Sequence, residues 1–519
     1  MTTQSTGPSR PTAPGGEGKG LAAGTLGLWG SVVIGLASTA PVYSLVATLG
    51  FVVLAVGAQA PIAFIVAFIP MLFIAFAYRE LNRAVPDCGT AFTWGTKAFR
   101  AFVGWMAGWG VAVAGMVVLA NLAQIGGQYL WLLVGDGSLA SNVPLVTATG
   151  VVFIALMTWV SYRGIELGER VQNVLLAVQY FALALFAIVA FVKVGTGEAP
   201  NPTPVSLDWF NPLGFTDYSG FIEAVLLALF IYWGWDTCLA LNEETKDPKR
   251  IPGRAALVTT VILLVTYVTV TVAAMSYAGL GTGGTGLANE DNANDVFLAL
   301  KDLILGPWAW ILVVAVLVSA VSSTQTTILP TARGTLSMAA YKALPKRFAT
   351  VHPKYQTPSF STLVMGIVAI VYYVGMTFIS ENILADSILS LGLAIAFYYG
   401  ITGFACVWYF RRELFTSARN FFFKGLFPLL GALMLGYAFI QSCIDMYDVD
   451  YGYTVIWGIG GTFVIGVGAL ALGVVLMLIW WAFPRSKPFF RGESLNRDTE
   501  VLVPDSPEVY GRSVDGGLT

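Results

Sequence analysis

The chain has 519 residues, of which 56% are apolar and 11% are charged, and its mean hydropathy is +0.73. Soluble domains carry about 25% charged residues, so this composition places the chain in a membrane and excludes an ordinary soluble fold. The net charge of −2 provides no general attraction for nucleic acid. The lone histidine, His352, lies in a polar loop, so we expect neither a zinc centre nor a Ser–His triad, and no cofactor.

Residues 1–20 are rich in Gly, Pro, Ser and Thr and contain no apolar run, which predicts a disordered cytoplasmic tail without a signal peptide. Apolar runs of roughly 20 residues follow, each long enough to cross a bilayer. The predicted spans are about twelve: 24–50, 58–78, 101–134, 143–162, 171–194, 218–241, 255–279, 306–332, 358–379, 383–410, 423–442 and 454–483. Residues 485–519 are polar and interrupted by prolines, and predict a cytoplasmic C-terminal tail.

The distribution of charge supports this count. With the N-terminus inside, all of the 28 Lys and Arg residues except Lys193 and Lys301 fall on the inner side. The outer loops carry acidic residues instead: Asp136, Glu290, Asp291, Asp445, Asp448 and Asp450. This bias follows the positive-inside rule, and predicts a multi-pass protein of the cell membrane with both termini in the cytoplasm.

Two of the apolar runs are interrupted. The first reads GLASTAPVYS over residues 35–44, where Pro41 lacks an amide donor and disfavours a continuous helix. The sixth is broken around Gly234, and Asp236 stands beside the break. A carboxylate in an apolar span costs about 2.5–3.5 kcal/mol at the helix centre, so such residues mainly face a polar pathway.

The two interrupted runs are the first helices of two sets of five. Matched breaks in corresponding positions indicate an inverted repeat with a binding site near the middle of the membrane. The predicted organisation is therefore a first repeat at 21–194, a second at 195–412, and two further helices at 413–484.

Three sequence blocks resemble the amino acid–polyamine–organocation superfamily. Residues 80–109 are similar to its pattern EL…PxxGGxYxW…GFxxGW, with Thr90 and Phe92 as departures. Residues 230–255 resemble FFAYxGFD…EExKNPxRxIP, and residues 333–358 resemble R…MA…LP…VHPKxxTP. The resemblance implies an all-α membrane protein with a five-plus-five inverted repeat, broken helices 1 and 6, and two extra helices, as in the sodium-coupled leucine transporter.

The resemblance also implies that the two breaks bind the α-carboxylate and the α-amine of a small substrate. Half-helix N-termini expose amide donors to an anion, and half-helix C-termini offer carbonyls to a cation. The substrate-binding residues expected on this basis are Ser38, Thr39, Ala40, Val42, Tyr43, Ser44, Phe230, Trp233, Gly234 and Trp235, with Asn121 and Gln124 from the third run. Asn121 and Gln124 could instead bond neighbouring helices, and the two Trp side chains could pack or face lipid.

Two departures from the family pattern bear on mechanism. Many relatives have GSG where this chain has Pro41, Val42 and Tyr43, so one amide donor is lost and Tyr43 narrows the site. Proton-coupled relatives often carry a Lys in helix 5, and the alignment places Gln179 there. Because Gln does not titrate, that proton mechanism is excluded.

The coupling ion stays open between three alternatives. Sodium would take oxygen ligands from the first-helix carbonyls and from the hydroxyls of Ser319, Ser322 and Ser323. A proton would be carried by Asp236, which could otherwise have only a structural or gating role. Uncoupled exchange would need neither ion.

Glu243 and Glu244 follow the sixth run and precede a basic turn. The pattern predicts a solvated ion-pair cluster with that turn, and a gate is the alternative.

The sequence therefore predicts a secondary transporter that imports or exchanges an amino acid or related amine by alternating access. Its partners would be the small-molecule substrate, a proton or sodium ion, and the lipid bilayer. The alternatives within this fold are a polyamine or nucleobase permease and a non-transporting sensor. An enzyme is disfavoured because no nucleophile–base pair is recognisable, and a channel because no filter-like repeat occurs.

Overall fold

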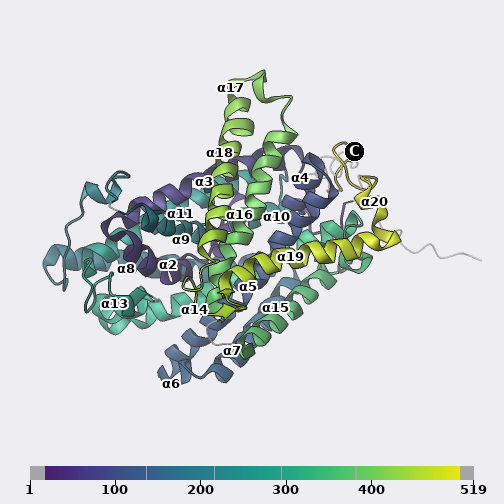
Figure 1. The fold of residues 1–519 in the computed structure, drawn as a ribbon. Coiled ribbons are helices and arrows are strands. Elements are labelled where there is room, and N and C mark those ends of the chain that lie inside the picture. Colours follow the sequence, from purple (N-terminus) through teal and green to yellow (C-terminus); the bar gives the residue numbers. More distant parts are fainter. Residues whose placement is uncertain (1–17, 136, 216, 294, 380–382, 503–519) are drawn as a thin grey trace, which may run out of the picture.

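The computed structural model describes residues 18–502, apart from residues 136, 216, 294 and 380–382. The described chain is almost entirely helical, as predicted (Figure 1). The strands β1 (Val455–Ile456) and β2 (Ile459–Gly460) form one short antiparallel hairpin.

The helices fall into two stretches on either side of a long loop. The first stretch contains α1 Leu28–Ser38, α2 Pro41–Val56, α3 Ala60–Ala84, α4 Ala91–Ala98, α5 Ala101–Val134, α6 Gly137–Ala140, α7 Val143–Arg163 and α8 Ile165–Thr196. The second contains α9 Tyr218–Ile231, α10 Thr237–Ala240, α11 Ile251–Ala278, α12 Glu290–Ala293, α13 Val296–Leu305, α14 Trp310–Ala340, α15 Ser359–Ile379, α16 Ile383–Tyr409, α17 Ala418–Asn420, α18 Phe427–Asp445, α19 Gly461–Ala482 and α20 Lys487–Phe490.

Within the described residues, ten helical segments are long and apolar enough to cross a membrane. The first, Leu28–Ala84, contains α1, α2 and α3, and so covers two of the predicted spans. The sixth predicted span, 218–241, is the interrupted pair α9 and α10, of which only α9 is a sizeable apolar helix. The other nine segments match the other nine predicted spans.

Both predicted interruptions are present, and each has a local cause. Between α1 and α2, Ala40 adopts a left-handed conformation with φ +47°, and Pro41 begins α2. Proline is favoured in the first turn of a helix because no partner is needed for its missing amide donor. Between α9 and α10, Gly234 has φ +111°, a conformation that residues with a Cβ rarely adopt.

The interrupted helices lie inside the bundle. Helix α2 packs against α9, and α1 packs against α10, while α5 packs along α14 and α3 along α11. Helices of the first predicted repeat thus contact those of the second, although the repeat itself stays a prediction. Helices α16 and α18 lie side by side, and α19 crosses α5 (Figure 1).

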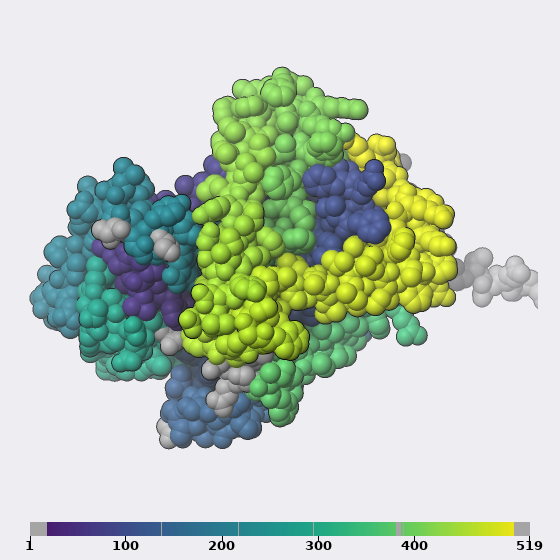
Figure 2. Space-filling view, viewed as in Figure 1, coloured from purple at the N-terminus to yellow at the C-terminus, as the bar shows by residue number. Residues whose placement is uncertain are grey.

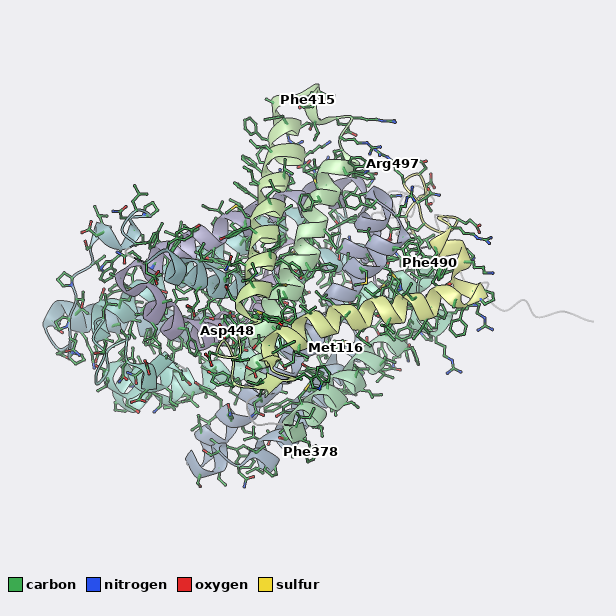
Figure 3. The ribbon with its side chains drawn as sticks, in the orientation of Figure 1. Met116, Phe378, Phe415, Asp448, Phe490 and Arg497 are labelled. Carbon is green, nitrogen blue, oxygen red and sulfur yellow. The ribbon has the colours of Figure 1, made fainter. Side chains whose placement is uncertain are left out.

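The outer surface carries large apolar side chains, including Phe378 of α15, which is 86% exposed (Figure 3). Exposed apolar side chains on long helices are what a lipid-facing surface requires. The chain after α19 returns to the protein, because Phe489 of α20 is fully buried with its ring centroid 5.5 Å from that of Phe92.

Candidate functional site

The two helix breaks meet in the interior. The hydroxyls of Ser38, at the end of α1, and Thr237, at the start of α10, are 2.7 Å apart. A Cβ added to Gly234 would lie 2.8 Å from the backbone of Ser38. The two unwound segments therefore touch through backbone and small polar groups, and Gly234 permits the close approach.

The start of α2 is tied to α5 and α14. The amide of Tyr43 donates to the Ser319 hydroxyl at 3.2 Å, and the Tyr43 phenol donates to the Asn121 side-chain oxygen. Asn121 thus contacts Tyr43 beside the first break, and its role in binding stays a prediction. Gln124 instead accepts a hydrogen bond of 2.8 Å from Tyr373 of α15, so it bonds a neighbouring helix.

Other residues of the first break form hydrogen bonds with its backbone. The Thr39 hydroxyl donates to the carbonyl of Leu36 at 2.7 Å, and the Ser44 hydroxyl donates to that of Thr39 at 2.6 Å. Ala40 and Val42 are buried beside them. These hydrogen bonds satisfy backbone groups that the missing helical turn would otherwise leave without partners.

Asp236 lies in an aromatic environment and is 9% exposed. Its carboxylate accepts from the Tyr399 phenol at 2.8 Å and from the Tyr398 phenol at 3.4 Å. The Trp233 indole donates to the Tyr398 oxygen at 2.5 Å, and the Trp235 ring centroid is 5.4 Å from that of Tyr399.

Asp236 has no ion-pair partner among the residues that the structure describes. Phe230, also predicted to bind substrate, lies one turn earlier in α9 and is half-buried. The indole nitrogen of Trp235 and the phenol of Tyr78, whose ring is 5.1 Å from the Trp235 ring, are buried without a hydrogen-bond partner. The second break is therefore a polar site with donors available inside an apolar bundle.

The serine hydroxyls of α14 contact the first break and helix α8. Ser323 donates to the carbonyl of Ser38 at 3.0 Å, which joins α14 to the end of α1. Ser322 donates to the side-chain oxygen of Gln172, and the Gln172 amide donates to the Ser322 carbonyl at 3.1 Å. The side chain of helix α8 that reaches Ser322 is thus Gln172, whereas Gln179 is buried with neither amide atom bonded.

A cluster of buried ionic groups closes the end of the bundle predicted to be cytoplasmic. Lys19 lies 2.7 Å from the Asp87 carboxylate and 2.6 Å from the Glu243 carboxylate, and the amide of Cys88 also donates to Glu243. Glu244 makes a two-pronged ion pair with Arg333 of α14, with distances of 2.7 and 2.9 Å. Lys19 belongs to the segment predicted as a tail; residues 1–17 of that segment lie outside the described part of the chain.

The predicted solvated cluster at Glu243 and Glu244 is wrong. Both residues are fully buried, and their partners are Lys19 and Arg333 instead of the adjoining basic turn. These partners come from segments distant in sequence, so the cluster joins the segment around Lys19 and helix α14 to the end of the interrupted sixth span. A gating role for this cluster stays a prediction.

The electrostatics of the cluster favour the charged forms of Lys19 and Asp87, whereas burial raises the pKa of Glu243. Burial disfavours the Lys19 ammonium, but the Asp87 and Glu243 carboxylates outweigh that effect and raise the pKa of Lys19. Burial also opposes ionisation of Asp87, yet Lys19 and the hydroxyls of Ser337 and Thr93 lower the pKa of Asp87. Asp87, Cys88 and Glu243 could together hold a metal ion, but the Lys19 ammonium already supplies the positive charge.

A family model described as amino acid permease matches residues 26–482. The chain belongs to this family. The descriptions of the family and of its curated relatives name permeases and transporters rather than enzymes.

Three curated relatives illustrate the range of the family. The chain is 26% identical to the methylthioribose transporter of Bacillus subtilis over 59% of this chain and 65% of that protein. It is 24% identical to the branched-chain amino acid permease BcaP of Bacillus subtilis, over the same shares. It is 23% identical to the low-affinity putrescine importer PlaP of Escherichia coli, over 79% of this chain and 87% of the importer. The match thus spans just under two thirds of the first relative.

Several residues of the site were not predicted, and most of them left only a weak signal in the sequence. Tyr398 and Tyr399 form a polar pair within an otherwise apolar run, and Gln172 is a second amide in the run that contains Gln179. Arg333 appeared only as part of a family block. Lys19 left no signal, because it lies in a segment without secondary-structure pattern.

Replacing Gly234 with Ala is expected to lower uptake at least about tenfold, since a positive φ costs a residue with a Cβ about 1–2 kcal/mol and the new methyl group meets Ser38. Gly375→Ala in α15 is the matched control, because no atom lies within 4 Å of the added Cβ. Uptake is measured in proteoliposomes, with the amount of folded protein checked by size-exclusion chromatography. Wild-type uptake by Gly234→Ala would contradict the role of the close approach.

Proposed function

We propose that the chain is a secondary active transporter that carries an amino acid or related amine across the cell membrane by alternating access. The observation that carries this proposal is the meeting of two interrupted spans at Ser38, Gly234 and Thr237, beside the buried carboxylate of Asp236. An interior site that presents both half-helix ends is suited to a small zwitterion or amine.

Each end of such a substrate has partners at the breaks. The carbonyl end of α1 suits an ammonium group, and the amides at the start of α2 suit a carboxylate. The Tyr43 amide donates to Ser319 in this structure, so a substrate carboxylate would replace the Ser319 hydroxyl there. Two of the three relatives are named for substrates with an amine group, branched-chain amino acids and putrescine.

We further propose proton coupling through Asp236 in preference to sodium coupling. The hydroxyls of Ser322 and Ser323, the expected sodium ligands, are engaged with Gln172 and with the Ser38 carbonyl. Asp236 is held by neutral phenols, so it can take up and release a proton without breaking an ion pair. We also propose that both termini lie in the cytoplasm and that the transporter imports or exchanges its substrate.

Proteoliposome transport tests these proposals. The substrate is first identified by a thermal-shift screen of the purified protein against amino acids, amines and nucleobases. Saturable uptake with counterflow is expected, and is the result that separates a carrier from a channel or a sensor. A proton gradient at equal sodium is expected to drive accumulation, and a sodium gradient at equal pH is not. Accumulation driven by sodium alone would overturn the coupling proposal, and Ser322→Ala would then raise the sodium concentration that uptake requires.

A nucleobase or polyamine substrate is the second candidate within this function. The putrescine importer matches the largest share of this chain among the three relatives described. A thermal shift with putrescine and none with α-amino acids would favour it.

A further inference from the structure

A cavity of about 520 Å³ lies on the surface remote from the helix breaks. Three parts of the chain form it: the turn between α4 and α5, the end of α16, and the segment that follows α20. Phe490 and Arg497, on its wall, lie on the same side of the molecule (Figure 3). In the space-filling view, the blue surface around residue 100 is framed by green α16 and by the yellow C-terminal segment (Figure 2).

The lining of this cavity is strongly basic. Five of the lining side chains are cationic and none is acidic: Lys97, Arg100, Arg411, Arg491 and Arg497. The hydrogen bonds of these groups do not neutralise them, because the acceptors are backbone carbonyls. Lys97 donates to the carbonyls of Asn496 and Thr499 at 3.0 and 2.6 Å, Arg411 to that of Trp408, and Arg497 to that of Tyr409, both at 2.8 Å.

Acidic neighbours offset only part of this charge. Glu493 approaches Arg491 at 3.9 Å, but both side chains are mostly exposed, so this pair contributes little. The carboxylates of Asp87 and Asp498, which lie outside the cavity lining, attract the Lys97 ammonium. Desolvation, together with repulsion from Arg497 and Arg412, lowers the pKa of Arg411. The cations are therefore crowded together, and an anion between them would relieve their repulsion.

The position of the cavity indicates which anion fits. Helix α5 begins at Ala101 and the candidate span Leu389–Tyr409 ends beside it, so the cavity lies where two membrane spans end. Phe102 and Trp408 on its wall are 38% and 50% exposed, and aromatic side chains of this kind occupy the membrane interface. A ligand there meets guanidinium groups at one end and an apolar surface at the other.

We propose that this cavity binds the phosphate headgroup of an anionic phospholipid. Basic pockets at the cytoplasmic ends of membrane helices are suited to such headgroups, and guanidinium groups to phosphate oxygens. The C-terminal segment supplies one wall, and it is also tied to the ion-pair cluster, because the Leu502 carbonyl accepts from Lys19 at 3.2 Å. A bound lipid would therefore hold that segment against the membrane end of the bundle.

The test compares lipid retention by the full-length protein and by variants. Protein purified in mild detergent is mixed with phosphatidylglycerol or with phosphatidylcholine of the same chain length, and bound lipid is counted by native mass spectrometry. The double variant Arg411→Gln/Arg491→Gln is expected to retain phosphatidylglycerol roughly 30-fold more weakly than the wild type, since each juxtamembrane cation contributes roughly fivefold. Arg347→Gln, an exposed arginine on the same predicted face but outside the cavity, is the matched control.

Each outcome bears on the proposal. Preference for phosphatidylglycerol in the wild type and in Arg347→Gln, lost in the double variant at an unchanged unfolding temperature, supports it. Equal retention of the two lipids by the wild type, or undiminished phosphatidylglycerol binding by the double variant, overturns it. If inorganic phosphate at millimolar concentration stabilises the lipid-free wild type and displaces phosphatidylglycerol, the site takes a soluble anion and the lipid assignment is wrong. Transport activity does not enter these readouts, so they are independent of the proposed substrate.

Discussion

Asp236→Asn is expected to abolish accumulation of substrate under a pH gradient while substrate counterflow continues. The amide keeps the size of the side chain and can still accept from Tyr399, but it cannot carry a proton. A gradient of one pH unit corresponds to about 1.4 kcal/mol. With one proton carried per substrate, the wild type can therefore raise the internal substrate concentration to about ten times the external concentration. The variant is expected to reach only equal concentrations on the two sides. Uptake into proteoliposomes at an imposed pH gradient measures this difference.

Two further variants test whether the effect is specific to the Asp236 carboxylate. Tyr399→Phe removes the stronger hydrogen bond to the carboxylate, and is expected to shift the pH dependence of uptake without abolishing accumulation. Asp302→Asn, an exposed carboxylate on α13, is the matched control and should behave as the wild type. Wild-type accumulation by Asp236→Asn would refute proton coupling through this residue.

Arg333→Met is expected to destabilise the protein by about 3–5 kcal/mol, because it leaves the Glu244 carboxylate buried without its partner. Both side chains of this pair are fully buried, so water cannot take the place of the guanidinium. The measurement is the unfolding temperature in detergent, together with the fraction of protein that elutes as a single species.

The double variant Glu244→Met/Arg333→Met tests whether the unpaired Glu244 carboxylate causes the loss of stability. Removing both charges is expected to recover most of the lost stability, since apolar replacement of a buried pair is often neutral or stabilising. Lys301→Met, which breaks an exposed ion pair with Asp302, is the control, and should cost no more than about 1 kcal/mol. A double variant as unstable as Arg333→Met would show that the loss comes from packing and not from the unpaired carboxylate.

The pair also bears on function, because Glu244 follows the interrupted sixth span and Arg333 belongs to α14. Movement of the sixth span relative to α14 must break this pair or carry both residues together. If the double variant is stable, its rate of counterflow reports whether the pair limits alternating access.

Local features of the chain were enough to predict the membrane spans and their two breaks. Hydropathy over about 20 residues reports whether a segment can lie in lipid. The same signal located every span, although some predicted ends differ from the observed helix ends by several residues, as at Trp310–Ala340 and Gly461–Ala482. The breaks at Pro41 and Gly234 were also predictable, since a missing amide donor and a positive φ are properties of single residues.

The partners of the site residues were decided by the tertiary structure. Gln172 and Gln179 stand in the same helix, and only the packing of α8 against α14 selects Gln172 as the partner of Ser322. Lys19 meets Glu243 across more than 200 residues of sequence. Helices in a membrane bundle are apolar on every side, so periodicity does not reveal which face points inward, and polar contacts between helices depend on that orientation. Sequence therefore determined which segments cross the membrane and where two of them break, and packing decided which side chains meet there.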